Sequence, residues 1–122
     1  MRFLIYRAPV LAYIALIYYV SSGPVNPEIT GGLPDWVLHG AAYLILYLLV
    51  FWAVHEGTRP LPGRGGYALP LLLTVLYGLS DEFHQSFVPA RDASVRDLIA
   101  DAAGALLGAG LIRLQRKTAT DS

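Results

Sequence analysis

The strongest constraint on the fold is a run of 20 residues, from Trp36 to His55, that contains no aspartate, glutamate, lysine or arginine. An α-helix rises 1.5 Å per residue, so about 20 mostly apolar residues cross the roughly 30 Å of hydrocarbon in a bilayer. Hydrophobic residues make up 55% of the chain, which exceeds the roughly 45–50% of a typical soluble domain. The run therefore predicts a membrane-spanning helix, with the lipid bilayer as a partner of the chain.

The N-terminal segment predicts another span. It is apolar from Phe3 onward apart from Arg7, whose long side chain can extend toward the membrane surface. It ends at Ser21-Ser22-Gly23-Pro24, a sequence that favours a turn. A cleaved signal peptide would also begin with basic residues, but no convincing A-x-A-like cleavage site follows the apolar run. We therefore expect this segment to be retained as a span.

The two C-terminal spans carry acidic residues. The apolar run from Tyr67 to Ser80 has 14 residues, about 21 Å as a helix, so a spanning helix has to continue through Asp81-Glu82-Phe83-His84-Gln85. The run from Val95 to Leu114 is long enough but contains Asp101. The sequence thus predicts an all-α membrane protein, a four-transmembrane-helix bundle that forms a single domain over residues 1–122. The expected spans are residues 3–22, 36–55, 67–87 and 95–114.

The basic residues predict the orientation, because cytoplasmic loops carry an excess of lysine and arginine. If the N-terminus is cytoplasmic, only Arg91 and Arg96 lie on the outer side. The basic residues on the cytoplasmic side are then Arg2, Arg7, Arg59, Arg64, Arg113, Arg116 and Lys117. The acidic residues at the outer side or the outer helix ends are Glu28, Asp35, Asp81, Glu82, Asp92, Asp97 and Asp101. Both termini are therefore predicted to be cytoplasmic.

Charge and cysteine content exclude several classes of function. The formal net charge is +0, so no long-range field attracts nucleic acid, and no nucleic-acid partner is expected. The chain has no cysteine, which rules out a disulfide framework and thiolate chemistry. Aspartate, glutamate and histidine can bind metals, but the sequence has no HExxH or comparable spacing, so we predict no metal and no cofactor.

Polar residues on three spans are expected to meet at one level of the bundle. Residues four apart share a helical face, and this spacing relates Asp35, His39 and Tyr43 in the second span. The third span brings Glu82 and Gln85, which are three apart, and the fourth brings Asp97 and Asp101, which are four apart. Ionisable groups at membrane depth usually face the bundle interior and mark functional sites.

Several roles are open to these residues. His39 or Glu82 could serve as a general base in catalysis. Arg91 could hold an anionic group. Binding roles are open to the others: Asp35, Tyr43, Gln85, Asp97 and Asp101. Alternatively the cluster is a structural network that closes the outer end of the bundle, His39 is a buried hydrogen-bonded histidine, and Asp97 with Ser94 only caps the fourth helix.

The pair Gly104 and Gly108 predicts how the fourth span packs. Glycines four apart let two helix backbones approach closely in lipid. They lie on the same face as Asp97 and Asp101, so they would press those acids against a neighbouring helix. We interpret the pair as ordinary small-residue packing.

The segment from Tyr77 to Gly104 resembles the VanZ-like membrane proteins. Their pattern has a glutamate and glutamine three apart, an aromatic residue, a proline before an arginine, two polar residues and a glycine. It falls here on Glu82, Gln85, Phe87, Pro89, Arg91, Asp97, Asp101 and Gly104. Two positions depart from it, because Ala90 stands where glycine is common and Asp101 where asparagine is frequent. The second departure adds a carboxylate that must be paired or protonated.

The resemblance implies a multi-pass protein of the bacterial cytoplasmic (inner) membrane. The namesake of the family is associated with resistance to the glycopeptide antibiotic teicoplanin. The first hypothesis is therefore a membrane protein of the envelope that affects how a glycopeptide or a lipid-linked cell-wall precursor meets the outer face. Two alternatives remain open, namely an intramembrane hydrolase or transferase acting on a lipid-linked or amphiphilic substrate, and a small transporter.

Overall fold

The computed structural model describes residues 2–22, 28, 31–56, 65–88 and 95–121. These residues form four long helices, which confirms the predicted all-α four-helix fold. The helices are α1 (Arg2–Ser21), α3 (Asp35–His55), α4 (Gly65–Gln85) and α5 (Val95–Asp121). Helix α4 continues through its acidic C-terminal turn, as expected. Helix α5 extends beyond the predicted Leu114, because the residues that follow include glutamine, arginine and lysine, which are good helix formers.

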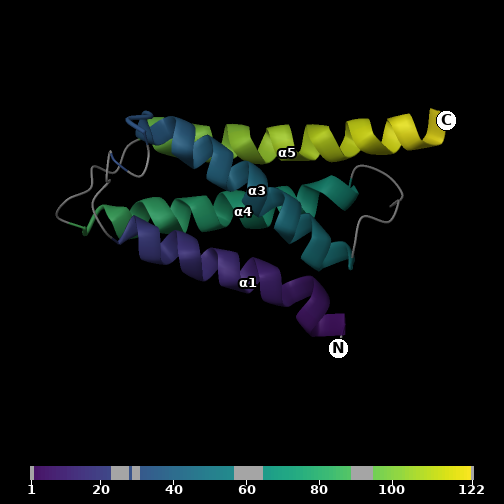
Figure 1. Cartoon of the computed structure of the whole chain (residues 1–122), viewed down its shortest axis with the longest axis horizontal. Helices are drawn as coiled ribbons and strands as arrows, with labels where there is room; N and C mark the ends of the chain where they lie inside the picture. The colour runs from purple at the N-terminus through teal and green to yellow at the C-terminus, as the bar shows by residue number, and fades with distance from the viewer. Residues whose placement is uncertain (1, 23–27, 29–30, 57–64, 89–94, 122) are drawn as a thin grey trace.

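The four helices run in alternating directions (Figure 1). The N-terminal end of α1 and the C-terminal end of α5 lie at the same end of the bundle. The opposite end collects the C-terminal ends of α1 and α4 and the N-terminal ends of α3 and α5. The polar segments of α3, α4 and α5 therefore meet at one end, as their positions in the sequence predict.

Helices α3 and α5 approach most closely at two glycines. A Cβ atom added to Gly104 would overlap the carbonyl oxygen of Gly40 and lie 3.0 Å from the backbone nitrogen of Leu44. A Cβ added to Gly108, one turn later, would lie 3.0 Å from the Tyr47 ring. Only a residue without a side chain permits this spacing, so the prediction that Gly104 and Gly108 serve helix packing is confirmed.

Side chains that donate to main-chain carbonyls join the other helices. The hydroxyl of Tyr13 in α1 donates to the Ala42 carbonyl of α3 at 2.9 Å. The hydroxyl of Tyr77 in α4 donates to the Ile14 carbonyl of α1 at 3.1 Å. Polar bonds between helices contribute to association in lipid, where burial of apolar surface provides no driving force. Each bond thus fixes one helix against the next without burying a charge.

Prolines inside α1 and α4 create two further contacts of this kind. Proline has no N–H, so the carbonyl four residues before it loses its helical donor. For Pro70 that carbonyl belongs to Gly66, and it lies 2.6 Å from Nε2 of His55 in α3. For Pro9 it belongs to Ile5, which accepts a longer bond of 3.4 Å from the Trp52 indole. Side chains of α3 therefore replace the donors that both prolines remove.

The bundle differs from a soluble domain in its exterior and in the ionisable groups that it buries beside a hydrophobic core. Buried positions include His39, Asp81 and Asp101, whereas large apolar side chains are exposed on all four helices. These exposed side chains include Leu4, Leu11, Leu16, Ile45, Leu69, Leu72, Leu76, Leu79, Ile99, Leu106, Leu107 and Leu111. Among the described residues, two helices are long and apolar enough to cross a membrane by themselves, over Leu4–Ser21 and Asp35–His55. An apolar exterior, with the ionisable groups turned inward, is what a lipid environment favours.

Candidate functional site

Five carboxylates from three helices lie at the end of the bundle where α3 and α5 begin, and we call this group and its surroundings the acidic end. Its members are Asp35 of α3, Asp81 and Glu82 of α4, and Asp97 and Asp101 of α5. Three of them, Asp81, Asp97 and Asp101, are buried. The carboxylates lie near the ends of their helices. At the N-terminal ends of α3 and α5 the positive end of the helix dipole stabilises a nearby carboxylate.

His39 lies at the centre of the acidic end and contacts carboxylates through both ring nitrogens. Its Nδ1 lies 2.7 Å from Oδ1 of Asp101, which is 1% exposed. Its Nε2 lies 3.6 Å from Oδ2 of Asp35, which is too long for a hydrogen bond. The short contact at Nδ1 fixes the orientation of the ring and favours a proton on that nitrogen. Nε2 is thereby directed toward the half-buried Asp35 at the outer edge of the bundle.

Tyr43, one turn after His39, joins α3 to α4. Its hydroxyl donates to Oδ2 of Asp81 at 2.9 Å, and both residues are buried. The ring of Tyr43 is parallel to that of His39 at a centroid distance of 6.2 Å. The predicted face of α3 thus presents two polar side chains to two different partner helices. Asp81 was not among the predicted binding residues, although its position four residues before Gln85 indicated a shared face.

The remaining predicted residues take different positions. Asp97 is buried, and Glu82 is half-buried near the Asp101–His39 pair. Gln85 is 1% exposed, and within the part of the chain that the structure describes its Oε1 has no hydrogen-bond partner. Arg91, predicted to bind an anionic group, lies outside the described residues, as does Ser94, the predicted cap of α5. The structure thus brings the acids, His39, Tyr43 and Gln85 of the prediction to one end of the bundle.

Two sets of side chains have the spacing of metal ligands. One ligand atom each from Asp35, His39 and Asp97 lies within 4.8 Å of the others, and the same holds for His39, Glu82 and Asp101. Ligands from different helices leave no local spacing in the sequence, which is why the sequence indicated no metal. Carboxylate oxygen and imidazole nitrogen together suit divalent transition metals.

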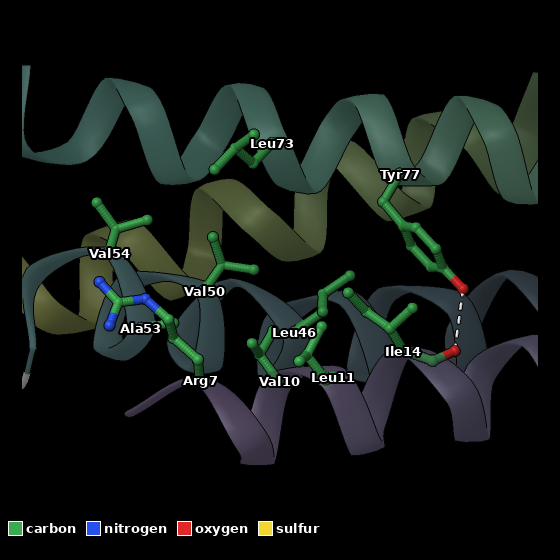
Figure 2. A pocket seen from close by; sticks show the side chains of 10 residues that line it. All are labelled: Arg7, Val10, Leu11, Ile14, Leu46, Val50, Ala53, Val54, Leu73 and Tyr77. Carbon is green, nitrogen blue, oxygen red and sulfur yellow. Dashed lines mark hydrogen bonds between the residues drawn. The ribbon is translucent and has the colours of Figure 1, made fainter. Parts of the chain in front are cut away.

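An apolar groove of about 500 Å³ lies between α1, α3 and α4, mainly in the half of the bundle away from the acidic end, and its Tyr77 end reaches toward the acidic end. Figure 2 shows the Arg7 side chain toward one end of the groove and Tyr77 at the other, where its hydroxyl bonds to Ile14. The Tyr77 ring stacks on Tyr43 at a centroid distance of 6.3 Å, so two tyrosines separate the groove from Asp81. The groove is lined by Arg7, Val10, Leu11, Ile14, Leu46, Val50, Ala53, Val54, Leu73 and Tyr77.

His84 makes a contact that the sequence did not predict. Its Nε2 lies 3.0 Å from the Ser22 hydroxyl at the end of α1, and its ring stacks on Tyr18 at 4.6 Å. Through these contacts His84 joins α4 to α1. Nothing in the spacing of these residues along the chain indicated this pair.

The comparisons with known proteins agree with the resemblance noted in the sequence. The family model described as VanZ/LLP1 matches residues 14–116, which include α3, α4 and most of α5. No curated protein and no solved structure matches the chain. The match covers most of the sequence and the whole acidic end. The chain therefore belongs to the VanZ/LLP1 family.

Proposed function

We propose that this protein is a multi-pass protein of the bacterial inner membrane whose acidic end lies at the outer face and binds the polar part of an amphiphilic envelope molecule. The observation that carries the proposal is the burial of His39, Asp97 and Asp101 at one end of a bundle with an apolar exterior. Buried ionisable groups are costly in a membrane and are usually retained for function. Family membership is consistent with this role.

The groove supports an amphiphile as the ligand. The groove offers an apolar surface along the bundle, and its volume is within the usual range for small-molecule sites. The acidic end offers carboxylates and an imidazole next to it, beyond Tyr77 and Tyr43. A molecule with an acyl or prenyl chain and a polar head could contact both. A lipid-linked cell-wall precursor and a lipid-bearing glycopeptide such as teicoplanin both have this character, and the family resemblance favours such ligands.

The proposed topology has both termini in the cytoplasm. The alternating helices place the ends of α1 and α5 together (Figure 1), and most basic residues of the chain belong to that side. Because the chain has no cysteine, a single cysteine introduced at Pro27 or Gly63 is a clean reporter. We expect an impermeant maleimide to label intact cells at Pro27→Cys and, only after permeabilisation, at Gly63→Cys. The reverse pattern would overturn the orientation.

Glu82 provides the test of function, because it is half-buried and lies near His39. Replacing it with glutamine keeps the shape and removes the charge. We expect Glu82→Gln to weaken ligand binding by on the order of 10- to 100-fold, as expected for a lost hydrogen bond to a charged group. Teicoplanin susceptibility of a bacterium that expresses the protein is the readout, with protein abundance measured in parallel.

Glu28→Gln is the control for this experiment, since Glu28 is an exposed acid outside the cluster. We expect it to behave like the wild type. If Glu82→Gln is abundant and fully active, the acidic end is not the functional site. If activity falls only in proportion to the amount of protein, the result would instead support a structural role for the acidic end.

An intramembrane hydrolase or transferase is the second candidate, and the Asp101–His39 pair favours it. A buried carboxylate that orients the Nδ1 of an imidazole leaves Nε2 to accept a proton, as in a general base. A purified enzyme would convert a labelled membrane-lipid extract, and His39→Gln would abolish conversion while the protein still binds the extract. If the wild type binds the lipid extract but converts none of it, the result contradicts the enzyme and supports the non-catalytic role.

A further inference from the structure

Carboxylates from two helices, α3 and α5, lie close to the His39 ring on the side of Asp35. The Nε2 of His39 and the Oδ2 of Asp35 are 3.6 Å apart, and the Asp97 carboxylate completes a group whose ligand atoms lie within 4.8 Å of one another. Two ligands held about 2.1 Å from a tetrahedral ion are roughly 3.4 Å apart. The spacing is therefore too long for a hydrogen bond and suitable for a shared cation.

Asp101 has the position of a residue that orients a metal-binding histidine. Histidines that bind metals usually donate the other ring N–H to a carboxylate, which fixes the tautomer and the direction of the ring. Here Nδ1 of His39 contacts Oδ1 of Asp101 at 2.7 Å. A distance this short leaves no room for an ion between the two atoms. The ligand position is thus at Nε2, on the side of Asp35.

Two buried oxygens at the acidic end provide an independent indication. Oδ2 of Asp101 and Oε1 of Gln85 have no hydrogen-bond partner among the described residues, and each residue is 1% exposed. Such groups are costly unless a donor or a positive charge is nearby. Gln85 follows Glu82 by three residues and so lies on the same face of α4. These oxygens favour a positive charge at the acidic end, but Oδ2 of Asp101 faces α4, where a Cβ on Gly78 would lie 3.2 Å from it, so it is not a ligand of an ion at Nε2.

We propose that Asp35, His39 and Asp97 bind one divalent transition-metal cation, with Asp101 as the positioning residue. Imidazole nitrogen with carboxylate oxygen suits the ions from Mn²⁺ to Zn²⁺. Three protein ligands leave one coordination position of the ion open. Because the Asp35 side chain is partly exposed, we expect this open position to face the surface of the bundle. This inference deepens the proposed function, because the open position would receive the polar head of the amphiphile.

The experiment uses the full-length protein purified in detergent, stripped with EDTA and titrated with Co²⁺ and Zn²⁺ in the absence of any lipid ligand. We expect one Co²⁺ per chain, with the visible absorption bands of a nitrogen and oxygen environment, and displacement by Zn²⁺. His39→Gln and Asp35→Asn should weaken binding by at least 100-fold. Asp101→Asn should weaken it by about 10- to 100-fold, the usual effect of changing a carboxylate that orients a metal-binding histidine.

His84→Gln is the matched control, because His84 lies at the same end of the bundle but bonds to Ser22. It should bind Co²⁺ like the wild type. If the wild type binds no Co²⁺, or binds it no better than Asp35→Asn, the proposal is wrong. Equal losses in His84→Gln would also overturn it, by indicating non-specific binding. Since no lipid ligand is present, a failure here leaves the proposed function standing, and failure of the Glu82→Gln test leaves the metal site standing.

Discussion

Replacing Gly104 with alanine is expected to destabilise the protein by about 3 kcal/mol, at the upper end of the usual cost of overpacking. The added methyl group would overlap the main-chain carbonyl of Gly40, and backbone cannot move aside as a flexible side chain can. Helices α3 and α5 would have to separate along their closest contact. The midpoint of thermal unfolding in detergent should fall by on the order of 10 °C.

Gly110→Ala is the matched control, since it makes the same change on the same helix. A Cβ at Gly110 meets no atom within 4 Å, and alanine favours helix by roughly 1 kcal/mol over glycine. The control should therefore keep or slightly raise the midpoint. Equal midpoints for the two variants would mean that the close approach of α3 and α5 is absent in the folded protein.

Replacing His39 with leucine is expected to cost about 3 kcal/mol, the penalty for leaving a buried charged acceptor without its hydrogen-bond donor. The reason is the Asp101 carboxylate, which is 1% exposed and would lose its 2.7 Å contact with the imidazole. Chemical or thermal unfolding in detergent, with helix content as the signal, measures the loss.

The double variant His39→Leu with Asp101→Leu tests this explanation. Replacing both partners with apolar residues removes the uncompensated buried carboxylate, so most of the lost stability should return. The losses of unfolding free energy in the two single variants, added together, should therefore exceed the loss in the double variant by several kcal/mol. Additive costs would show that the two side chains contribute independently and that their contact has no energetic role.

The sequence predicted the architecture well because helix length and hydropathy are local properties. It also predicted that α4 continues through Asp81 and Glu82, since the apolar run alone is too short to cross a bilayer. Among the described residues, α4 and α5 are not among the helices that are apolar enough to span by themselves, and both carry carboxylates, Asp81 and Glu82 in α4 and Asp97 and Asp101 in α5. The acidic end follows from the direction of each helix, which alternates along the chain.

The partners within the acidic end were less predictable. Periodicity along one helix shows which residues share a face, but not how far that helix is rotated or shifted against its neighbour. Contacts such as Tyr43 with Asp81, or Gly104 with Gly40, depend on this rotation. The glycine spacing indicated that α5 packs closely, yet only the structure identifies α3 as the helix it meets. The proposed metal ligand set has no signature in the sequence for the same reason, because it combines α3 with α5.

The prolines of α1 and α4 have a consequence for how the sequence can change over generations. The acceptors that they free belong to the main chain of Ile5 and Gly66, so substitutions at those two positions leave the acceptors in place. The donors and the prolines, in contrast, depend on each other. A relative that replaces Pro70 regains the N–H for the Gly66 carbonyl and no longer needs an imidazole at position 55. Pro70 and His55 are therefore expected to be kept or lost together in descendant sequences.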